Sequence, residues 1–153
     1  MKKTELLRKA LVAGSQWCKA RPEQFTVWAE KGSVEIDATG EASFLYRYEI
    51  RVLVMDFPEH IDALMLPVLA WVHQQQPDLL LNPDSNKKIG FEAEILSDDT
   101  ADILITIPVW ERVMVTRQNG IVTATHLPED RPRFHRSEWD EAFFDPSNGE
   151  VAP

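Results

Sequence analysis

The chain has one cysteine, six glycines and no long apolar run among its 153 residues. With Cys18 alone it can form neither an internal disulfide nor a cluster of thiolate metal ligands, which favours a reducing compartment. The glycines are scattered singly, so no glycine-rich loop is present that could cradle a phosphate. No segment approaches the roughly 20 apolar residues of a membrane span, and the basic N-terminus turns amphipathic at once, unlike a signal peptide. The sequence therefore predicts neither secretion nor membrane insertion by these routes.

Basic residues are also in short supply. Sixteen Lys and Arg stand against 25 Asp and Glu, which gives a formal net charge of -9. Proteins that sheathe nucleic acid use Lys and Arg to displace phosphate counterions, so the composition argues against that class. No sequence-specific nucleic-acid partner is expected. The apolar fraction of 44% and the charged fraction of 27% are typical of a folded globular domain.

Residues that could perform catalysis lack the required spacing. A zinc site needs three or four convergent ligands, and a calcium loop needs alternating acids, a central glycine and a late glutamate. Neither pattern surrounds the scattered histidines or the acids Asp98, Asp99 and Asp102. Glu92 and Glu94 share one side of a predicted strand, as is ordinary for a wet sheet face. We therefore expect no metal, no cofactor and no enzymatic activity; a hydrolase with Asp98 and Asp102 as metal ligands is the least favoured interpretation.

Helical spacing occurs in two parts of the chain. Near the N-terminus, Leu7, Ala10 and Leu11 form one apolar stripe with Thr4 as a candidate cap, and a short second turn over 16–20 follows. In the centre, apolar residues from Ile61 to Val72 recur at i, i+3, i+4 and i+7. Pro67 lies inside this second pattern and should kink the helix or split it in two, because proline removes a backbone donor.

The remaining segments up to about residue 125 alternate with a period of two, as strands do. Residues 25–38 are predicted as a hairpin with a turn at Lys31-Gly32-Ser33. Residues 43–57 form the clearest strand; it exceeds the usual length of about 3–10 residues, so we expect a bulge or a projecting end. Further strands are predicted around 91–95, 103–115 and 121–125, the last two joined at Asn119-Gly120. Pro108 marks an edge or a bulge, because it cannot donate to a ladder.

These elements predict one α/β (α+β) domain over residues 1–127. It would have an antiparallel sheet of about five to six strands, with an N-terminal helix and a Pro-kinked central helix packed on it. Arg47, Glu49 and Arg51 lie on one side of the long strand and are candidate contacts with another copy of the chain. A merely solvated face is the equal alternative.

The segment 128–153 is different in character. It is rich in proline and acids, yet it holds Phe134, Trp139, Phe143 and Phe144. A disordered tail rarely carries four large aromatic residues. Because Trp139 and Phe143 are four apart, they suit one helical face. We predict a C-terminal arm that folds against a partner or a neighbouring subunit, with packing on its own domain as the even alternative; Phe134, Trp139 and Phe143 are its candidate contacts.

Several stretches together resemble the tail completion protein R family of contractile-tailed bacteriophages. They run in order from Leu7 to Glu129 and are densest from Phe44 onward. The longest are the central stretch 62–71 (Asp-Ala-Leu-Met-Leu-Pro-Val-Leu-Ala-Trp) and the later stretch 98–103 (Asp-Asp-Thr-Ala-Asp-Ile). Shorter ones are 7–11, 44–48, 56–57, 76–80, 82–83, 91–96, 111–113 and 126–129. The segment from Pro132 to Phe144 matches nothing in the family.

The resemblance implies a role in virion assembly. Members of the family finish the tail tube and make it competent to join the DNA-filled head, and they look similar in element order to tail terminator proteins, which form a six-fold ring on the upper end of the tube. The expected partners are therefore other copies of the chain, the tail tube and head-tail joining proteins. The expected location is the virion tail, and the host cytoplasm during assembly, for a phage or a prophage. The family implies no catalytic residues. A monomeric binding module or adaptor is the alternative from another class.

Overall fold

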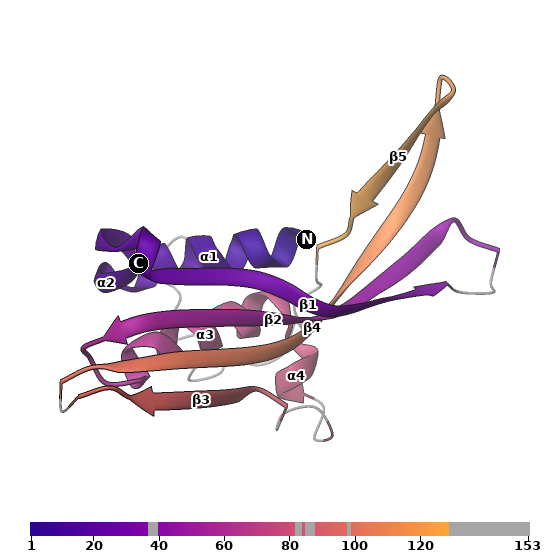
Figure 1. Ribbon diagram of the computed structural model, residues 1–153. Coiled ribbons are helices and arrows are strands. Elements are labelled where there is room, and N and C mark those ends of the chain that lie inside the picture. The colour runs from indigo at the N-terminus through magenta and orange to yellow at the C-terminus, as the bar shows by residue number, and fades with distance from the viewer. Residues whose placement is uncertain (37–39, 82–83, 85–87, 98, 129–153) are drawn as a thin grey trace, which may run out of the picture.

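The computed structural model describes residues 1–36, 40–81, 84, 88–97 and 99–128. Two helices precede two paired strands, and two further helices lead into three consecutive antiparallel strands (Figure 1). The helices are α1 (Lys2–Gly14), α2 (Gln16–Ala20), α3 (Asp62–Gln75) and α4 (Asp78–Leu81), with a 3-10 turn at Pro22–Gln24. The strands are β1 (Phe25–Ile36), β2 (Ser43–Phe57), β3 (Gly90–Ile95), β4 (Ala101–Gln118) and β5 (Ile121–His126).

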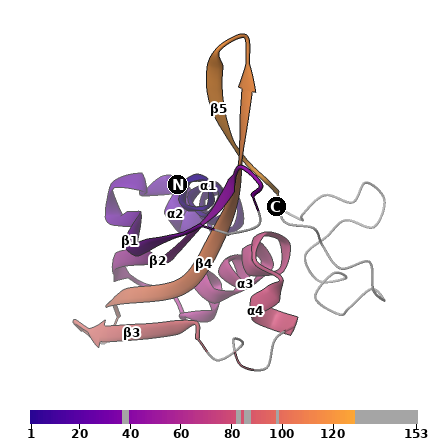
Figure 2. The same cartoon turned by 90° about the vertical axis from the view of Figure 1, so that its right-hand side faces the viewer.

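All the strands join one antiparallel sheet. Its order is β1-β2-β4-β3, and β5 pairs with β4 off this path. The helices gather on one face of the sheet, which we call the inner face, and no described helix covers the outer face (Figures 1 and 2). The α+β class and the antiparallel sheet predicted from the sequence are confirmed, with five strands.

Strand alternation decides which side chains enter the core. The even-numbered residues of β2 from Tyr48 to Val54 are buried, and they pair with the buried odd-numbered residues of β4 from Ile103 to Val109. Leucines and valines of α1 and α3 pack on this inner face. Each fully buried aliphatic side chain contributes about 1.5–3 kcal/mol. The apolar side chains that recur every two residues in the strands and every 3.6 residues in the helices therefore form a single apolar layer.

The predicted turn at Lys31-Gly32-Ser33 is wrong, because β1 continues through it. The pairing with β2 shifts between Glu30 and Ser33, and Lys31 adopts a φ of 54°. One extra residue is accommodated there as a β-bulge. The apolar residues of β1 have odd numbers before this point, as at Val27, and even numbers after it, as at Val34. A bulge shifts the alternation of side chains by one residue, and a turn would produce the same shift in the sequence pattern. Both segments consequently remain on the inner face of one strand.

The long strand β2 has the predicted bounds, and it has both a bulge and a projecting end, the two features expected from its length. Its pairing with β4 is irregular between Val54 and Phe57, where Asp56 has a φ of 54°. Its other end extends past the helices with the second half of β1. The strand is thus bent at its C-terminal end and projects at its N-terminal end.

The two main helices touch at a glycine. α3 is not divided at Pro67 but runs as one element from Asp62 to Gln75. A Cβ placed on Gly14, at the end of α1, would lie only 2.7 Å from the Cβ of Pro67. Ser15 then caps α2 by accepting a hydrogen bond from the Cys18 N–H at 3.2 Å. The absence of a side chain at Gly14 therefore sets how closely α1 and α3 approach.

Two hairpin arms leave the same end of the sheet. One arm is the outer half of the β1–β2 hairpin, and the other is the hairpin of β4 and β5, which turns at Asn119-Gly120 as the sequence predicts (Figures 1 and 2). The two arms stay paired through β2 and β4 up to Ser43 and Met114, and at the end of the first arm the Val115 N–H donates to the carbonyl of Ala42 at 2.7 Å. Beyond that point the hairpin of β4 and β5 continues alone, and most residues of both arms are exposed.

Candidate assembly surface

One edge of β4 is open at the root of the arms. On the side away from β2, β4 pairs with β3 through residues 101–106 and with β5 through residues 113–118. No described strand pairs with residues 107–112 on that side. Pro108 lies in this gap and has no N–H to leave unsatisfied, so of the two predicted places, an edge or a bulge, it lies at a locally open edge.

Side chains from the helical layer take the place of the missing strand. The Oε1 atom of Gln76 accepts a hydrogen bond from the Trp110 N–H at 3.2 Å. Lys3 donates through Nζ to the carbonyl of Trp110 at 2.7 Å and to the same Gln76 oxygen at 2.6 Å. Farther along, the Leu127 N–H donates to the carbonyl of Arg112 at 2.9 Å. The Trp110 N–H and carbonyl and the Arg112 carbonyl therefore have partners without a neighbouring strand, as buried backbone groups require.

A buried carboxylate lies beside this gap. Glu111, only 3% exposed, points to the inner face of β4. Its carboxylate accepts hydrogen bonds from the Tyr48 hydroxyl at 2.5 Å and from the Lys2 N–H at 3.1 Å, and it lies 3.2 Å from Nδ1 of His126. Burial, then the hydrogen bond to Glu111 and its negative charge, raise the pKa of Tyr48 above its ordinary value.

The same carboxylate caps the first helix. The N-cap position of α1 is Met1, which offers no side-chain hydrogen bond. Thr4, the cap expected from the sequence, instead lies within the helix, and its hydroxyl donates to the carbonyl of Met1 at 2.5 Å. Glu111 from β4 accepts from the free N–H at the helix start, where a negative charge also suits the helix dipole.

Together these residues tie the arms to the body. Lys3 and Gln76 belong to the helical layer and Tyr48 to β2, while Glu111 and His126 belong to β4 and β5. No motif in the sequence marks this cluster. The sequence signal available was spacing. Lys3 continues the helical stripe of Leu7 and Leu11, and Glu111 falls in the buried alternation of β4 between Val109 and Val113. His126, one of the histidines that show no metal-binding spacing in the sequence, is part of the cluster.

The predicted contacts Arg47, Glu49 and Arg51 do share the outer face of β2. Arg51 approaches Glu49 at 3.2 Å and Glu30 at 3.1 Å. Arg47 pairs with Glu35 at 2.6 Å and lies over the ring of Trp110 at 5.5 Å. The face therefore has its charges paired within the chain, and its use as an interface remains a prediction. The other candidates, Phe134, Trp139 and Phe143, lie outside the described residues.

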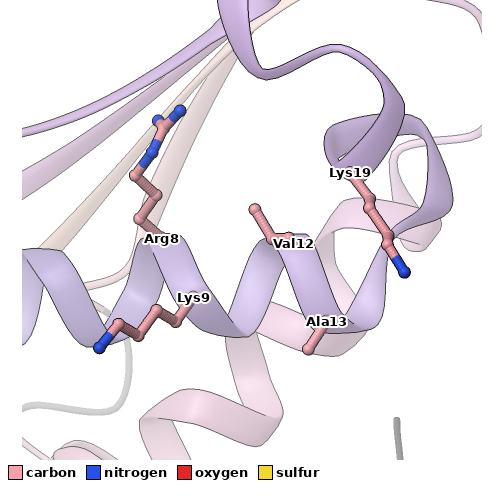
Figure 3. A pocket seen from close by; sticks show the side chains of 5 residues that line it. All are labelled: Arg8, Lys9, Val12, Ala13 and Lys19. Carbon is pink, nitrogen blue, oxygen red and sulfur yellow. The ribbon is translucent and has the colours of Figure 1, made fainter.

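A shallow hollow opens on α1 and α2 (Figure 3). It is lined by Arg8, Lys9, Val12, Ala13 and Lys19. Arg8 is directed toward the start of β1, where it donates to the carbonyls of Pro22 and Phe25 and lies 4.3 Å from the Phe25 ring centre. The hollow is basic but open, and no acidic or aromatic group converges on it to suggest a ligand.

Exposed apolar side chains collect in two other places. On the arms, Val34, Ile36, Ile121 and Val122 are 56–83% exposed. At the opposite end of β4, Phe91 and Ile95 of β3 are 59% and 79% exposed, although they share the inner face with the core residues. These two patches are the candidate assembly surface.

No group of three or more His, Cys, Asp or Glu side chains in the described part of the chain could hold a metal ion. No helix among the described residues is both long and apolar enough to cross a membrane.

Comparison with known proteins identifies similar chains. The family model described as P2 phage tail completion protein R (GpR) matches residues 1–130. Tail completion protein R of Escherichia phage P2 is 32% identical over 133 residues, which cover 86% of this chain and 86% of that protein. No solved structure matches the fold or the sequence significantly.

Proposed function

Because the chain belongs to the phage tail completion protein R family, we propose that it is a structural subunit that finishes the phage tail. It caps the upper end of the tail tube and makes the tail competent to join the head. The family match over residues 1–130 carries this proposal. Activity arises from binding surfaces, and no small compound is transformed.

Several structural features support an assembly role. The arms extend beyond the helical layer and carry exposed apolar residues, whereas such residues are normally buried in a domain that works alone. Both β3 and β5 are edge strands, which can pair with a strand of another chain. A head-to-tail contact repeated by a closing rotation forms a ring. We propose that the chain forms such a ring on the tube end, as tail terminator proteins do.

The net charge suits a passage for DNA. With a formal charge of -9, the chain would repel phosphate groups, and acids facing the lumen of a ring would let the genome slide through. A basic lumen would instead hold the DNA by counterion release.

The proposal is tested by removing the gene from a phage or prophage that encodes this chain. Electron microscopy of the lysate should then show filled heads and unattached tails, and supplying the gene on a plasmid should restore joined virions. A plasmid carrying a frameshifted copy is the matched control. Joined, infectious virions in the absence of the protein would refute the proposed role and favour a dispensable monomeric adaptor.

A further inference from the structure

Part of each exposed apolar patch lies on an edge strand that pairs with β4, namely β5 in the arm patch and β3 in the other. β5 and β3 pair only with β4, at opposite ends of the same edge, and each has six residues. Every residue of β3 is exposed, and so is every residue of β5 up to Thr125. In each strand the outward row of backbone N–H and C=O groups has no strand partner among the described residues. Such an edge is a template for an added strand.

Both strands place apolar side chains on the inner face of the sheet, the face that the helices cover elsewhere. On β5, Val122 and Ala124 fall on the inner face, next to Arg117 and Val115 of β4. On β3, Phe91, Ala93 and Ile95 fall on the inner face, next to Ile105 and Ile103. Joining the two edges with their inner faces on the same side would therefore bring apolar residues together, and such cross-strand pairs stabilise a sheet.

Charge selects which edges meet. From Arg112 to His126 the β4–β5 arm contains two arginines and no acid. The β3 strand and the turn after it carry Glu92, Glu94 and Asp99, and all three are exposed. Glu92 and Glu94 lie on the outer face, so a contact of β3 with β3 would bring like charges together. The β5 edge carries no acid, and Arg112 of β4 lies at its root on the same outer face, so a contact of β5 with β3 brings opposite charges to one face, while Arg117 lies on the inner face. The arm half of β1 carries one base, Lys31, and one acid, Glu35, which is paired with Arg47, so it offers β3 no net opposite charge.

We propose that β5 of one copy adds to the edge of β3 of the next copy, so that the sheets of neighbouring subunits become continuous. This inference rests on the self-assembly stated under the proposed function and assigns the surfaces that carry it. The contact is head-to-tail, because the two surfaces differ, and its repetition gives a closed ring or a stack and not a two-fold dimer.

Directed cross-linking tests the contact in the full-length protein. Ala124→Cys on β5 and Ala93→Cys on β3 are matched substitutions of small exposed residues in the middle of each strand. The native Cys18 is fully buried, and burial raises the pKa of its thiol, so it should not react. The two variants, carrying different tags, are produced together in host cells that assemble tails, so that a ring closing only on the tube is also captured. A short bis-maleimide is then added.

The expected result is a cross-linked dimer that contains both tags, with neither variant cross-linking to itself. Cross-links within the Ala124→Cys variant alone would indicate a two-fold β5 contact and would overturn the proposal, as would the absence of any mixed dimer. In this assay Arg112→Glu/Arg117→Glu in the β5 partner should lower the yield of mixed dimer about tenfold or more. Adding Glu92→Lys/Glu94→Lys to the β3 partner should restore most of it. Lys9→Glu, in the hollow on α1, changes the net charge by the same sign and should leave the yield unchanged.

Failure of this contact is distinguishable from failure of the proposed function. If the wild-type protein completes tails and no mixed dimer forms, the β5–β3 contact is wrong and the role in tail completion stands. If deletion of the gene leaves joined virions intact, the role itself is wrong, whatever the cross-linking shows.

Discussion

Glu111 is the residue whose carboxylate holds together the elements at the root of the arms. It is almost fully buried, and its hydrogen bonds reach α1 and β2, with His126 of β5 at 3.2 Å. A buried polar residue is tolerated only where its partners are in place. Removing it leaves those partners without an acceptor inside the domain, which costs more than the net value of one hydrogen bond.

Glu111→Ala should therefore lower the free energy of unfolding by about 2–4 kcal/mol. Urea denaturation at neutral pH measures the change. Glu35→Ala is the matched control, because Glu35 is an exposed carboxylate paired with Arg47, and its loss should cost about 0–1 kcal/mol. Equal effects of the two substitutions would show that the buried cluster adds nothing to stability.

Tyr48 should make stability depend on pH in the alkaline range. Its pKa is raised in the folded protein by burial and by Glu111, so the fold favours the protonated phenol. The resulting stability is fully present below the unfolded-state pKa of about 10 and is lost as the pH rises above it. Between pH 8 and pH 11, roughly two units below and one unit above that pKa, the free energy of unfolding should fall more in wild type than in Tyr48→Phe. Parallel curves for the two proteins would exclude this linkage.

At the scale of elements, the contact of α1 with α3 depends on one missing side chain. Gly14 lies against Pro67, whose ring is held by α3 and cannot move aside freely. The same close approach ends α1 and directs the chain into α2.

Gly14→Ala should destabilise the protein by about 1–3 kcal/mol, because the added methyl group overpacks this contact. Gly90→Ala, in β3, is the control: nothing lies within 4 Å of the added Cβ, and the effect should be within about 0.5 kcal/mol. Thermal unfolding of both variants measures the difference. A neutral Gly14→Ala would mean that the helices can separate without cost.

At the scale of the whole molecule, the outer face of the sheet is a second candidate interface. Arg47→Glu combined with Arg51→Glu places like charges beside Glu35, Glu30 and Glu49. The side chains are partly exposed, so the fold should survive, while assembly of the tail should be weakened. Normal oligomer size and normal tail length in the double variant would remove this face from the assembly surface.

The C-terminal segment is tested by truncation. The family match ends at residue 130, before the segment Pro132–Pro153. A chain shortened by deletion of Pro132–Pro153 should therefore keep its melting temperature within a few degrees, on the order of 1 kcal/mol of stability, and lose docking to the tail. A much larger loss of melting temperature would instead place Phe134, Trp139 and Phe143 in the core of the domain.

The sequence by itself determined the elements and the sidedness of the sheet. Alternation from Tyr48 to Val54 predicts the buried face of β2, and spacing from Leu64 to Val72 predicts the face of α3, because local geometry alone repeats every 2 or 3.6 residues. Pro108 predicts an edge for the equally local reason that it lacks an N–H. These signals need no knowledge of distant residues.

Only the tertiary structure decided whether Lys31–Ser33 forms a turn or a bulge. It also decided which groups the buried polar residues of the helices, such as Lys3, hydrogen-bond to. A bulge and a turn change the face of the following residues in the same way, so parity cannot separate them; pairing with β2 does. Lys3 and Gln76 are 73 residues apart in sequence, and both meet the gap in β4 only after the helices have packed on the sheet. A hydrogen bond depends on where two groups stand in space, and the order of residues along the chain does not specify that by itself.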